Sequence, residues 1–225
     1  MSEMNKIPVY FMPGLAASSK IFENIKLDSS IYSIHLLEWK VPHTDESLES
    51  YVKRLLVDVK HENPVLMGVS FGGIIIQEMS RYISVRQLIV VSSVTSSKEF
   101  PRRMHLAKSL KLYNVFPTTL FSNFDYLKYI MVGKHLKKRL EMYKIYLFVN
   151  DKKYLDWAIK NVINWEGKDL NLPPNTVRIH GENDEVFPLK YIDKTNCYII
   201  PNASHAMIVY KYKWFNENLP TIIKY

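Results

Sequence analysis

A single serine is flanked by glycines in the segment GVSFG, residues 68–72. The chain has only seven glycines, and three of them, Gly68, Gly72 and Gly73, lie within six residues. Glycine accepts backbone conformations and close contacts that other residues do not, so this spacing is typical of a tight turn that presents Ser70. A serine hydroxyl in such a turn can act as a nucleophile when a base removes its proton. The alternative is that Ser70 only caps the helix that follows it.

A base and an acid for this serine are available in the second half of the chain. His205 lies in the segment NASHAM, directly after a short apolar run, and the segment GENDEVFP supplies Glu182, Asp184 and Glu185. A neutral imidazole can take the serine proton, and a carboxylate orients the imidazole and stabilises its charged form. The residues alone therefore predict His205 as the base and one of these three carboxylates as the acid. The plainer alternatives are a structural histidine and a carboxylate that closes a turn.

Six short apolar runs must position these residues. They are mostly β-branched or aromatic and are bounded by Gly, Pro, Asn or Ser, which is typical of strands. Most lack polar alternation, as expected when helices cover both faces of a parallel sheet. The runs are residues 7–12, 32–37, 64–69, 86–93, 176–181 and 197–201. Helical periodicity lies between them, so we expect an α/β fold with a reduced, mostly parallel sheet of about six strands flanked by helices.

The order of these elements explains why residues distant in the sequence would meet. In a parallel α/β sheet, reacting groups gather beyond the carboxyl ends of the strands. Ser70 follows the third run, the acidic segment follows the fifth, and His205 follows the last. A helix predicted to begin near residues 71–72 would place Ser70 at its N-terminus, where backbone N–H groups stabilise negative charge. His180, at the end of the fifth run, is interpreted as a structural residue.

The alternation of strands and helices stops between about residues 97 and 170. This stretch has helical patterns, many aromatic residues and no clear strand. Residues 98–139 hold ten Lys and Arg against two acidic residues, which equals the net charge of +8 for the whole chain. We expect a helical cap insertion over 98–169, with the core formed by 1–97 and 170–225. Its aromatic residues would form an apolar binding surface or pack its own helices, and its charge would attract an anionic substrate or form a solvated face.

Four segments, taken in chain order, resemble the α/β-hydrolase fold superfamily. They are PGLAASS after the first predicted strand, GVSFGG, HGENDEVFP and NASHAM. The chain looks like a compact, capped serine hydrolase, and the resemblance implies Ser70 as nucleophile, Asp184 as acid and His205 as base. The order Ser, Asp, His along the chain agrees with that superfamily. Asp184 is preferred over its glutamate neighbours because it alone aligns with the motif.

The resemblance also implies an oxyanion hole, a pair of backbone N–H groups that stabilise the negative oxygen formed during acyl transfer. Its donors would be Phe71, directly after the nucleophile, and Leu15, in the loop after the first strand. Many relatives have His-Gly in that loop where this chain has Pro-Gly. Because the donor is a backbone amide, the hole survives this change. Gly68 and Gly72 would be the glycines of the nucleophile elbow.

Together these inferences predict a serine hydrolase that cleaves a small-molecule carboxylic ester or thioester through an acyl-enzyme intermediate. The alternatives are an acyltransferase and a non-hydrolytic ligand-binding or regulatory protein, because the fold alone does not set the reaction. A peroxide-forming or dehalogenating variant is disfavoured.

The sequence also gives expectations about cofactors, nucleic-acid binding, cellular location and membrane insertion. It has no dinucleotide fingerprint and no metal-ligand spacing, so no cofactor or metal is expected, and no nucleic-acid motif accompanies the positive charge. The single cysteine and the lack of a signal-peptide pattern favour a cytoplasmic protein. No apolar stretch approaches the roughly 18 residues of a membrane span, so no stable membrane insertion is expected.

Overall fold

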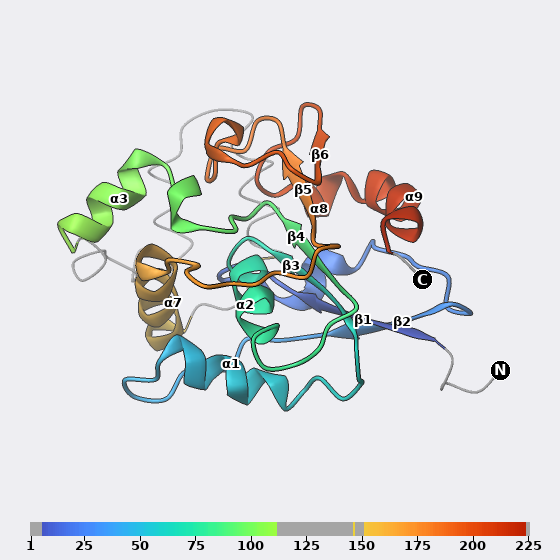
Figure 1. Ribbon diagram of the computed structural model, residues 1–225, viewed down its shortest axis with the longest axis horizontal. Coiled ribbons are helices and arrows are strands. Elements are labelled where there is room, and N and C mark those ends of the chain that lie inside the picture. Colours follow the sequence, from blue (N-terminus) through green and yellow to red (C-terminus); the bar gives the residue numbers. More distant parts are fainter. Residues whose placement is uncertain (1–5, 112–145, 147–150, 224–225) are drawn as a thin grey trace.

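The computed structural model describes residues 6–111, 146 and 151–223. At its centre lies a six-stranded sheet in the order β2-β1-β3-β4-β5-β6, with every neighbouring pair parallel (Figure 1). The strands are β1 (Ile7–Met12), β2 (Tyr32–Leu36), β3 (Val65–Val69), β4 (Gln87–Val91), β5 (Val177–Gly181) and β6 (Cys197–Ile200). The prediction of an α/β fold with about six parallel strands is therefore confirmed.

Helices connect the strands and cover the sheet. The α-helices are α1 (Leu48–Leu56), α2 (Phe71–Met79), α3 (Arg102–Ser109), α7 (Lys152–Asn164), α8 (Met207–Tyr210) and α9 (Tyr212–Ile222). Short 3-10 helices are η2 (Ser19–Phe22), η3 (Ser97–Glu99) and η5 (Leu189–Tyr191). Two helices follow His205, α8 and α9, and they are separated at Lys211.

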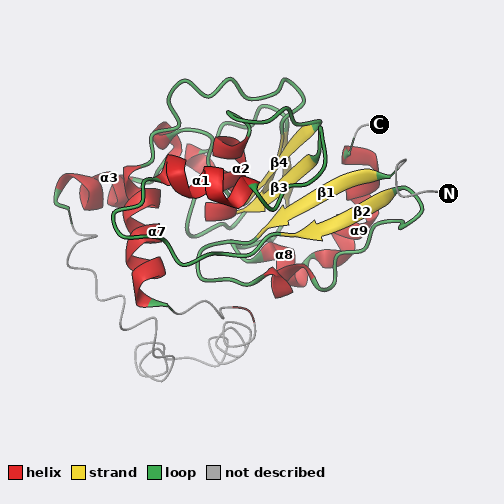
Figure 2. Ribbon diagram, turned by 90° about the horizontal axis from the view of Figure 1, so that it is seen from below, coloured by secondary structure: helices red, strands yellow, loops and turns green. Residues whose placement is uncertain are grey.

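Two apolar clusters lie on opposite faces of the sheet. Helices α1, α2 and α7 cover one face, and α8 and α9 cover the other (Figure 2). Strand β3 contributes to both clusters, because successive side chains of a strand point to opposite faces. Leu66 packs against the first group of helices, whereas Val65, Met67 and Val69 pack against the second. Burial on both faces explains why this strand lacks polar residues.

The strands end close to where the apolar runs end, with differences of one or two residues. The largest difference is at β4, which was expected to reach residue 93 and stops at Val91. Ser92 has a φ of 44°, which turns the chain away from the direction of the strand. Ser92 and Ser93 are nevertheless buried, and Ser93 lies against Gly73 near the start of α2.

A buried ion pair ties the segment after β4 to β5. The guanidinium of Arg178 donates two hydrogen bonds to the carboxylate of Glu99, at 2.6 and 2.8 Å. The same carboxylate accepts hydrogen bonds from the backbone N–H groups of Thr95 and Asp193. Both charged groups are thus paired and hydrogen-bonded, as burial of an ion pair requires.

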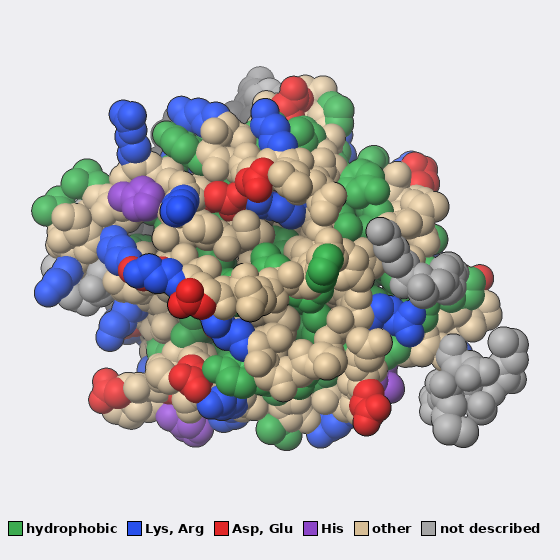
Figure 3. Space-filling model, viewed as in Figure 1, with side chains coloured by type: hydrophobic (Ala, Val, Ile, Leu, Met, Phe, Trp, Pro, Cys, Tyr) green, Lys and Arg blue, Asp and Glu red, His purple; other side chains and the backbone are tan. Residues whose placement is uncertain are grey.

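The predicted insertion over 98–169 lies partly outside the described residues, so its boundaries stay a prediction. Its described parts are mainly α3 and α7. Tyr154, Leu155 and Trp157 of α7 are buried in the same apolar cluster as α1 and α2. Five of the ten basic residues of 98–139 are described, and Lys and Arg side chains gather around α3, at left in Figure 3. The other five lie outside the described residues.

Candidate active site

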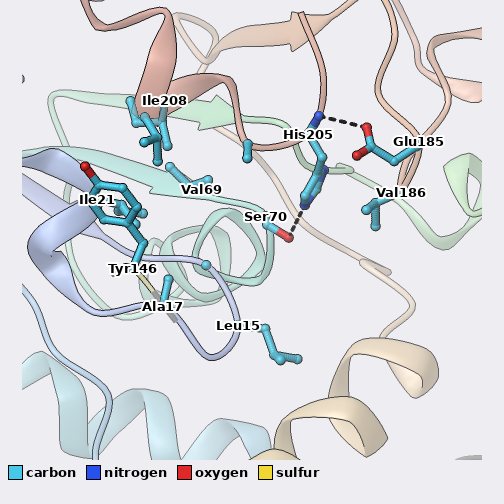
Figure 4. Close-up of a pocket in the computed structure, with 13 residues that line it drawn as sticks. Leu15, Ala17, Ile21, Val69, Ser70, Tyr146, Glu185, Val186, His205 and Ile208 are labelled. Carbon is cyan, nitrogen blue, oxygen red and sulfur yellow. Dashed lines mark hydrogen bonds between the residues drawn. The ribbon is translucent and has the colours of Figure 1, made fainter. Parts of the chain in front are cut away.

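Ser70 occupies the sharp turn between β3 and α2. Its backbone has a φ of 54° and a ψ of −120°, a conformation that is strained for any residue other than glycine. Two hydrogen bonds of 2.9 Å hold the turn: the N–H of Ser70 donates to the carbonyl of Val91, and the N–H of Gly73 donates to the carbonyl of Ser70. The strained turn directs the hydroxyl of Ser70 toward His205, outside the sheet (Figure 4).

The two glycines that flank Ser70 lie against other backbone atoms. A Cβ at Gly68 would be 2.3 Å from the carbonyl oxygen of Gly72. A Cβ at Gly72 would be 2.4 Å from the carbonyl oxygens of both Met12 and Pro13, at the end of β1. Side chains do not approach backbone atoms this closely, so both positions require glycine for β1, β3 and α2 to pack as they do.

The structure brings Ser70, Asp184 and His205 together from three separate loops. Nε2 of His205 is 2.9 Å from Oγ of Ser70, and Nδ1 of His205 is 3.0 and 2.9 Å from the two carboxylate oxygens of Asp184. Because a carboxylate only accepts, Nδ1 carries the proton and Nε2 is free to accept from the serine hydroxyl. Asp184 follows β5, and His205 lies between β6 and α8.

The carboxylate of Asp184 is fully buried and is held by the backbone around it. Its Oδ1 accepts hydrogen bonds from the N–H groups of Val186 and Phe187, at 2.9 and 2.8 Å. These bonds fix the direction of the carboxylate, and the carboxylate in turn fixes the plane of the His205 ring. The side chain of His205 is 19% exposed, so solvent reaches the imidazole but not the carboxylate.

The two glutamates beside Asp184 bind backbone groups instead of the imidazole ring. Glu182 accepts from the N–H of Asn202, and Glu185 accepts from the N–H of His205 at 3.1 Å. Among the three carboxylates that the residues alone left open, only Asp184 contacts the His205 ring.

A second histidine lies against the buried carboxylate. Nε2 of His180 donates to the carbonyl of Phe187 at 2.8 Å and is 3.5 Å from Oδ2 of Asp184. Burial lowers the pKa of His180 from its usual value, so the ring is neutral at pH 7. The position of His180 in the sequence indicates a structural role, and in the structure His180 supports the loop that carries Asp184.

The two residues expected to supply the oxyanion donors both lie near Ser70. Phe71 is the first residue of α2, where the helix leaves its N–H without an acceptor. Leu15 lies in the loop after β1 and lines the same cavity as Ser70. Within residues 6–111, 146 and 151–223, neither amide donates a hydrogen bond to another protein group. Both N–H groups are thus available to a bound oxygen atom.

A cavity of about 130 Å³ opens beside the serine hydroxyl. Figure 4 shows Ala17, Ile21, Val69 and Ile208 on one side of Ser70, and His205 with Glu185 and Val186 on the other. One side of Ser70 is therefore apolar, and the other side carries His205.

Tyr146 closes the apolar side of this cavity. Its carbonyl accepts from the N–H of Ser18 at 3.2 Å, and its hydroxyl donates to Glu23 at 2.7 Å. The hydrogen bond to the Glu23 carboxylate, together with burial, raises the pKa of Tyr146 to about 12, so the hydroxyl stays protonated. Tyr146 is the one described residue between 112 and 150, and it shows that part of the predicted insertion borders the cavity.

The described part of the chain also bears on metal binding and membrane insertion. No group of three or more His, Cys, Asp or Glu side chains there is arranged to hold a metal ion. None of the helices described is both long enough and apolar enough to cross a bilayer.

The fold of this chain is similar to that of several solved structures. An enol-lactonase from Burkholderia xenovorans LB400 superimposes with a TM-score of 0.71 at 11% identity, covering 97% of this chain and 91% of the other. The esterase EaEST from Exiguobacterium antarcticum gives 0.67 at 16% identity, covering 98% and 93%. This chain has the α/β-hydrolase fold. The fold predicted from the four sequence segments is thereby confirmed.

Other α/β-hydrolase structures match as well and differ in their described activities. A putative non-heme bromoperoxidase from Mycobacterium tuberculosis H37Rv superimposes with a TM-score of 0.68 at 14% identity, over 97% of this chain and 93% of the other. No protein-family model and no curated protein matches the sequence. The likeness therefore extends to the fold, and the reaction has to be argued from the site.

Proposed function

We propose that this protein is a serine hydrolase that cleaves a carboxylic ester or thioester through an acyl-enzyme intermediate. One observation carries the proposal: the hydroxyl of Ser70, on a strained turn, is 2.9 Å from Nε2 of His205, whose Nδ1 contacts the buried carboxylate of Asp184. The side chain of Ser70 makes no capping hydrogen bond to α2, so the alternative of a helix cap does not account for this arrangement. A base held in the correct tautomer by a buried acid is what activation of a serine requires.

The proposed reaction begins with attack by Oγ of Ser70 on the substrate carbonyl carbon. His205 takes the hydroxyl proton at Nε2 and becomes an imidazolium, which Asp184 stabilises. The carbonyl oxygen becomes negative and is bound by the N–H groups of Leu15 and Phe71. The bond to the alcohol or thiol then breaks as His205 returns the proton to the leaving group, leaving an acyl ester on Ser70.

Water completes the cycle by the same steps. His205, neutral again, removes a proton from a water molecule that attacks the acyl carbonyl, and the same two amides bind the oxyanion. The proton then returns to Oγ of Ser70 as the carboxylic acid leaves. The partial exposure of His205 supports this step, because solvent can reach the base.

The lining of the cavity supports an apolar group on one side of the scissile bond. Ala17, Ile21 and Ile208 offer aliphatic surface beside Ser70, and a cavity of about 130 Å³ favours a short chain over a long one. A substrate of this kind would gain affinity from removal of apolar surface from water. The attraction of an anionic substrate by the basic insertion stays a prediction, because half of those charges lie outside the described residues.

A fluorophosphonate probe and a p-nitrophenyl ester series test the proposal. We expect the wild type to be labelled at Ser70 and to hydrolyse short-chain esters faster than long-chain ones. Ser70→Ala should abolish labelling and lower kcat by at least about 10³-fold. The matched control is Ser80→Ala, at the other end of α2, where the hydroxyl only donates to the carbonyl of Gln77. It should behave like the wild type.

The same assay separates the alternatives. A wild type that labels but releases product only when an alcohol acceptor is added would be an acyltransferase. If the wild type is not labelled by the probe and cleaves no ester or thioester, the hydrolase proposal is contradicted. A ligand-binding role would then remain. Halogenation activity without esterase activity would point instead to the chemistry named for the bromoperoxidase.

A further inference from the structure

The carbonyl of Gly14 is held by two donors beside the active site. It accepts a hydrogen bond from Nε1 of Trp39 at 2.9 Å and another from the N–H of Ala17 at 3.0 Å. The peptide unit that contains this carbonyl also contains the N–H of Leu15. In a trans peptide the C=O and N–H point in opposite directions, and the described residues include no cis peptide bond. The hydrogen bonds that fix the Gly14 carbonyl therefore also fix the direction of the Leu15 N–H.

The indole ring of Trp39 also contacts the second oxyanion donor residue. It stacks on the ring of Phe71, with centroids 5.1 Å apart and an angle of 11° between the planes. Phe71 is almost completely buried, so its ring cannot move away from the indole without disturbing the core. One side chain thus contacts both units that carry the expected donors.

A tyrosine from α7 holds the next residue of the loop. The hydroxyl of Tyr154 lies 3.4 Å from the N–H of Ala16, and its ring centroid is 5.2 Å from that of Trp39. Burial raises the pKa of Tyr154 well above its usual value, so this hydroxyl remains neutral. Ala16 itself has a φ of 63°, which its own backbone preference disfavours. Neighbouring side chains are therefore needed to keep the loop in this shape.

We propose that Trp39 is the positioning residue of the oxyanion hole. It fixes the direction of the Leu15 N–H through the Gly14 carbonyl, and it fixes Phe71 by stacking. Its hydrogen bond also polarises the Gly14–Leu15 peptide, which makes the N–H a stronger donor. This inference rests on the proposed hydrolase function for its catalytic consequence, although the geometry stands without it.

The chain offers a matched control in Trp157. Its Nε1 donates to the carbonyl of Glu46 at 2.7 Å, and it is 9% exposed, as Trp39 is. It lies in the same aromatic cluster, and its ring centroid is 4.2 Å from that of Tyr51. Trp39→Phe and Trp157→Phe therefore remove the same donor from equally buried sites, and only Trp39→Phe releases the oxyanion loop.

The kinetic test compares the two variants on the best p-nitrophenyl ester. We expect Trp39→Phe to lower kcat by about 10- to 100-fold with little change in KM, because complete loss of a donor costs about 10²–10³-fold. Affinity for a boronic acid that forms a tetrahedral adduct with Ser70 should fall in parallel, while affinity for the carboxylic acid product stays the same. Trp157→Phe should change kcat less than about threefold. Equal decreases of kcat in the two variants would overturn the proposal. So would a change in the KM of Trp39→Phe without a decrease in its kcat.

A second measurement judges the geometry without any turnover. In ¹H–¹⁵N spectra, Trp39→Phe should shift the amide resonance of Leu15, and Trp157→Phe should leave it in place. The Phe71 amide does not distinguish the two variants, because the ring centroid of Trp157 also lies 6.0 Å from that of Phe71. An unmoved Leu15 resonance in Trp39→Phe would refute the positioning role even if the wild type cleaves no ester, which is the separate failure of the proposed function. If Trp39→Phe does not fold, benzothienylalanine at position 39 keeps the ring and its shape while removing only the N–H.

Discussion

The two sides of the proposed active site are held in different ways. On the serine side, β3, Ser70 and α2 are neighbours in the sequence, and the turn is fixed by contacts between backbone atoms at Gly68 and Gly72. On the oxyanion side, the loop from Gly14 to Ala16 is held by side chains of Trp39 and Tyr154, which come from distant segments. A local motif therefore specifies the proposed nucleophile, whereas long-range packing specifies the groups that would stabilise charge.

The largest expected effect comes from the acid, which orients the serine side. Asp184→Asn should keep the hydrogen bond to Nδ1 but favour the wrong tautomer of His205, so kcat should fall by about 10⁴-fold. Ester hydrolysis by the purified variant measures this loss. Glu182→Gln is the control, since Glu182 only accepts from the N–H of Asn202. If both variants lose the same activity, Asp184 has no special role.

A pair of glycine variants compares the two sides directly. Gly72→Ala would place a methyl group 2.4 Å from two backbone oxygens and should lower the free energy of unfolding by about 3 kcal/mol or more. Gly14→Ala, on the oxyanion side, meets its nearest atoms at 3.4 Å, so the unfolding free energy should change by less than about 1 kcal/mol. Urea denaturation measures both. Equal destabilisation would show that backbone crowding does not distinguish the two sides.

The smallest effect concerns the support of Asp184 and depends on pH. Burial lowers the pKa of His180 in the folded state, so below the usual histidine pKa of about 6.5 the unfolded chain binds a proton that the folded chain does not. The unfolding free energy should therefore fall as pH drops from 7 toward 5. His180→Gln, which can still donate to the Phe187 carbonyl, should make this dependence shallower. An unchanged slope in denaturation curves would exclude His180 as its source.

The sequence predicted best what neighbouring residues determine. Six apolar runs marked the six strands, because strands buried on both faces cannot carry polar side chains. The tight turn at Ser70 could be predicted from the glycine spacing, because close contacts between backbone atoms leave no room for a side chain. The acid was narrowed to one residue by resemblance alone, since three adjacent carboxylates look alike until their hydrogen bonds are known.

Other features depended on contacts that no local pattern carries. Trp39 follows an ordinary edge strand, and only the packed structure shows its indole bonded to the Gly14 carbonyl. The ion pair between Glu99 and Arg178 joins residues 79 positions apart. The end of β4 was placed too late, because apolar composition does not reveal the positive φ of Ser92.

The buried ion pair between Glu99 and Arg178 has a consequence for how the chain can be altered. It attaches the chain to β5 shortly before α3, and the buried aromatic residues of α7 attach the chain to the core again. We therefore expect substitutions between these two attachment points to leave Ser70, Asp184 and His205 in place.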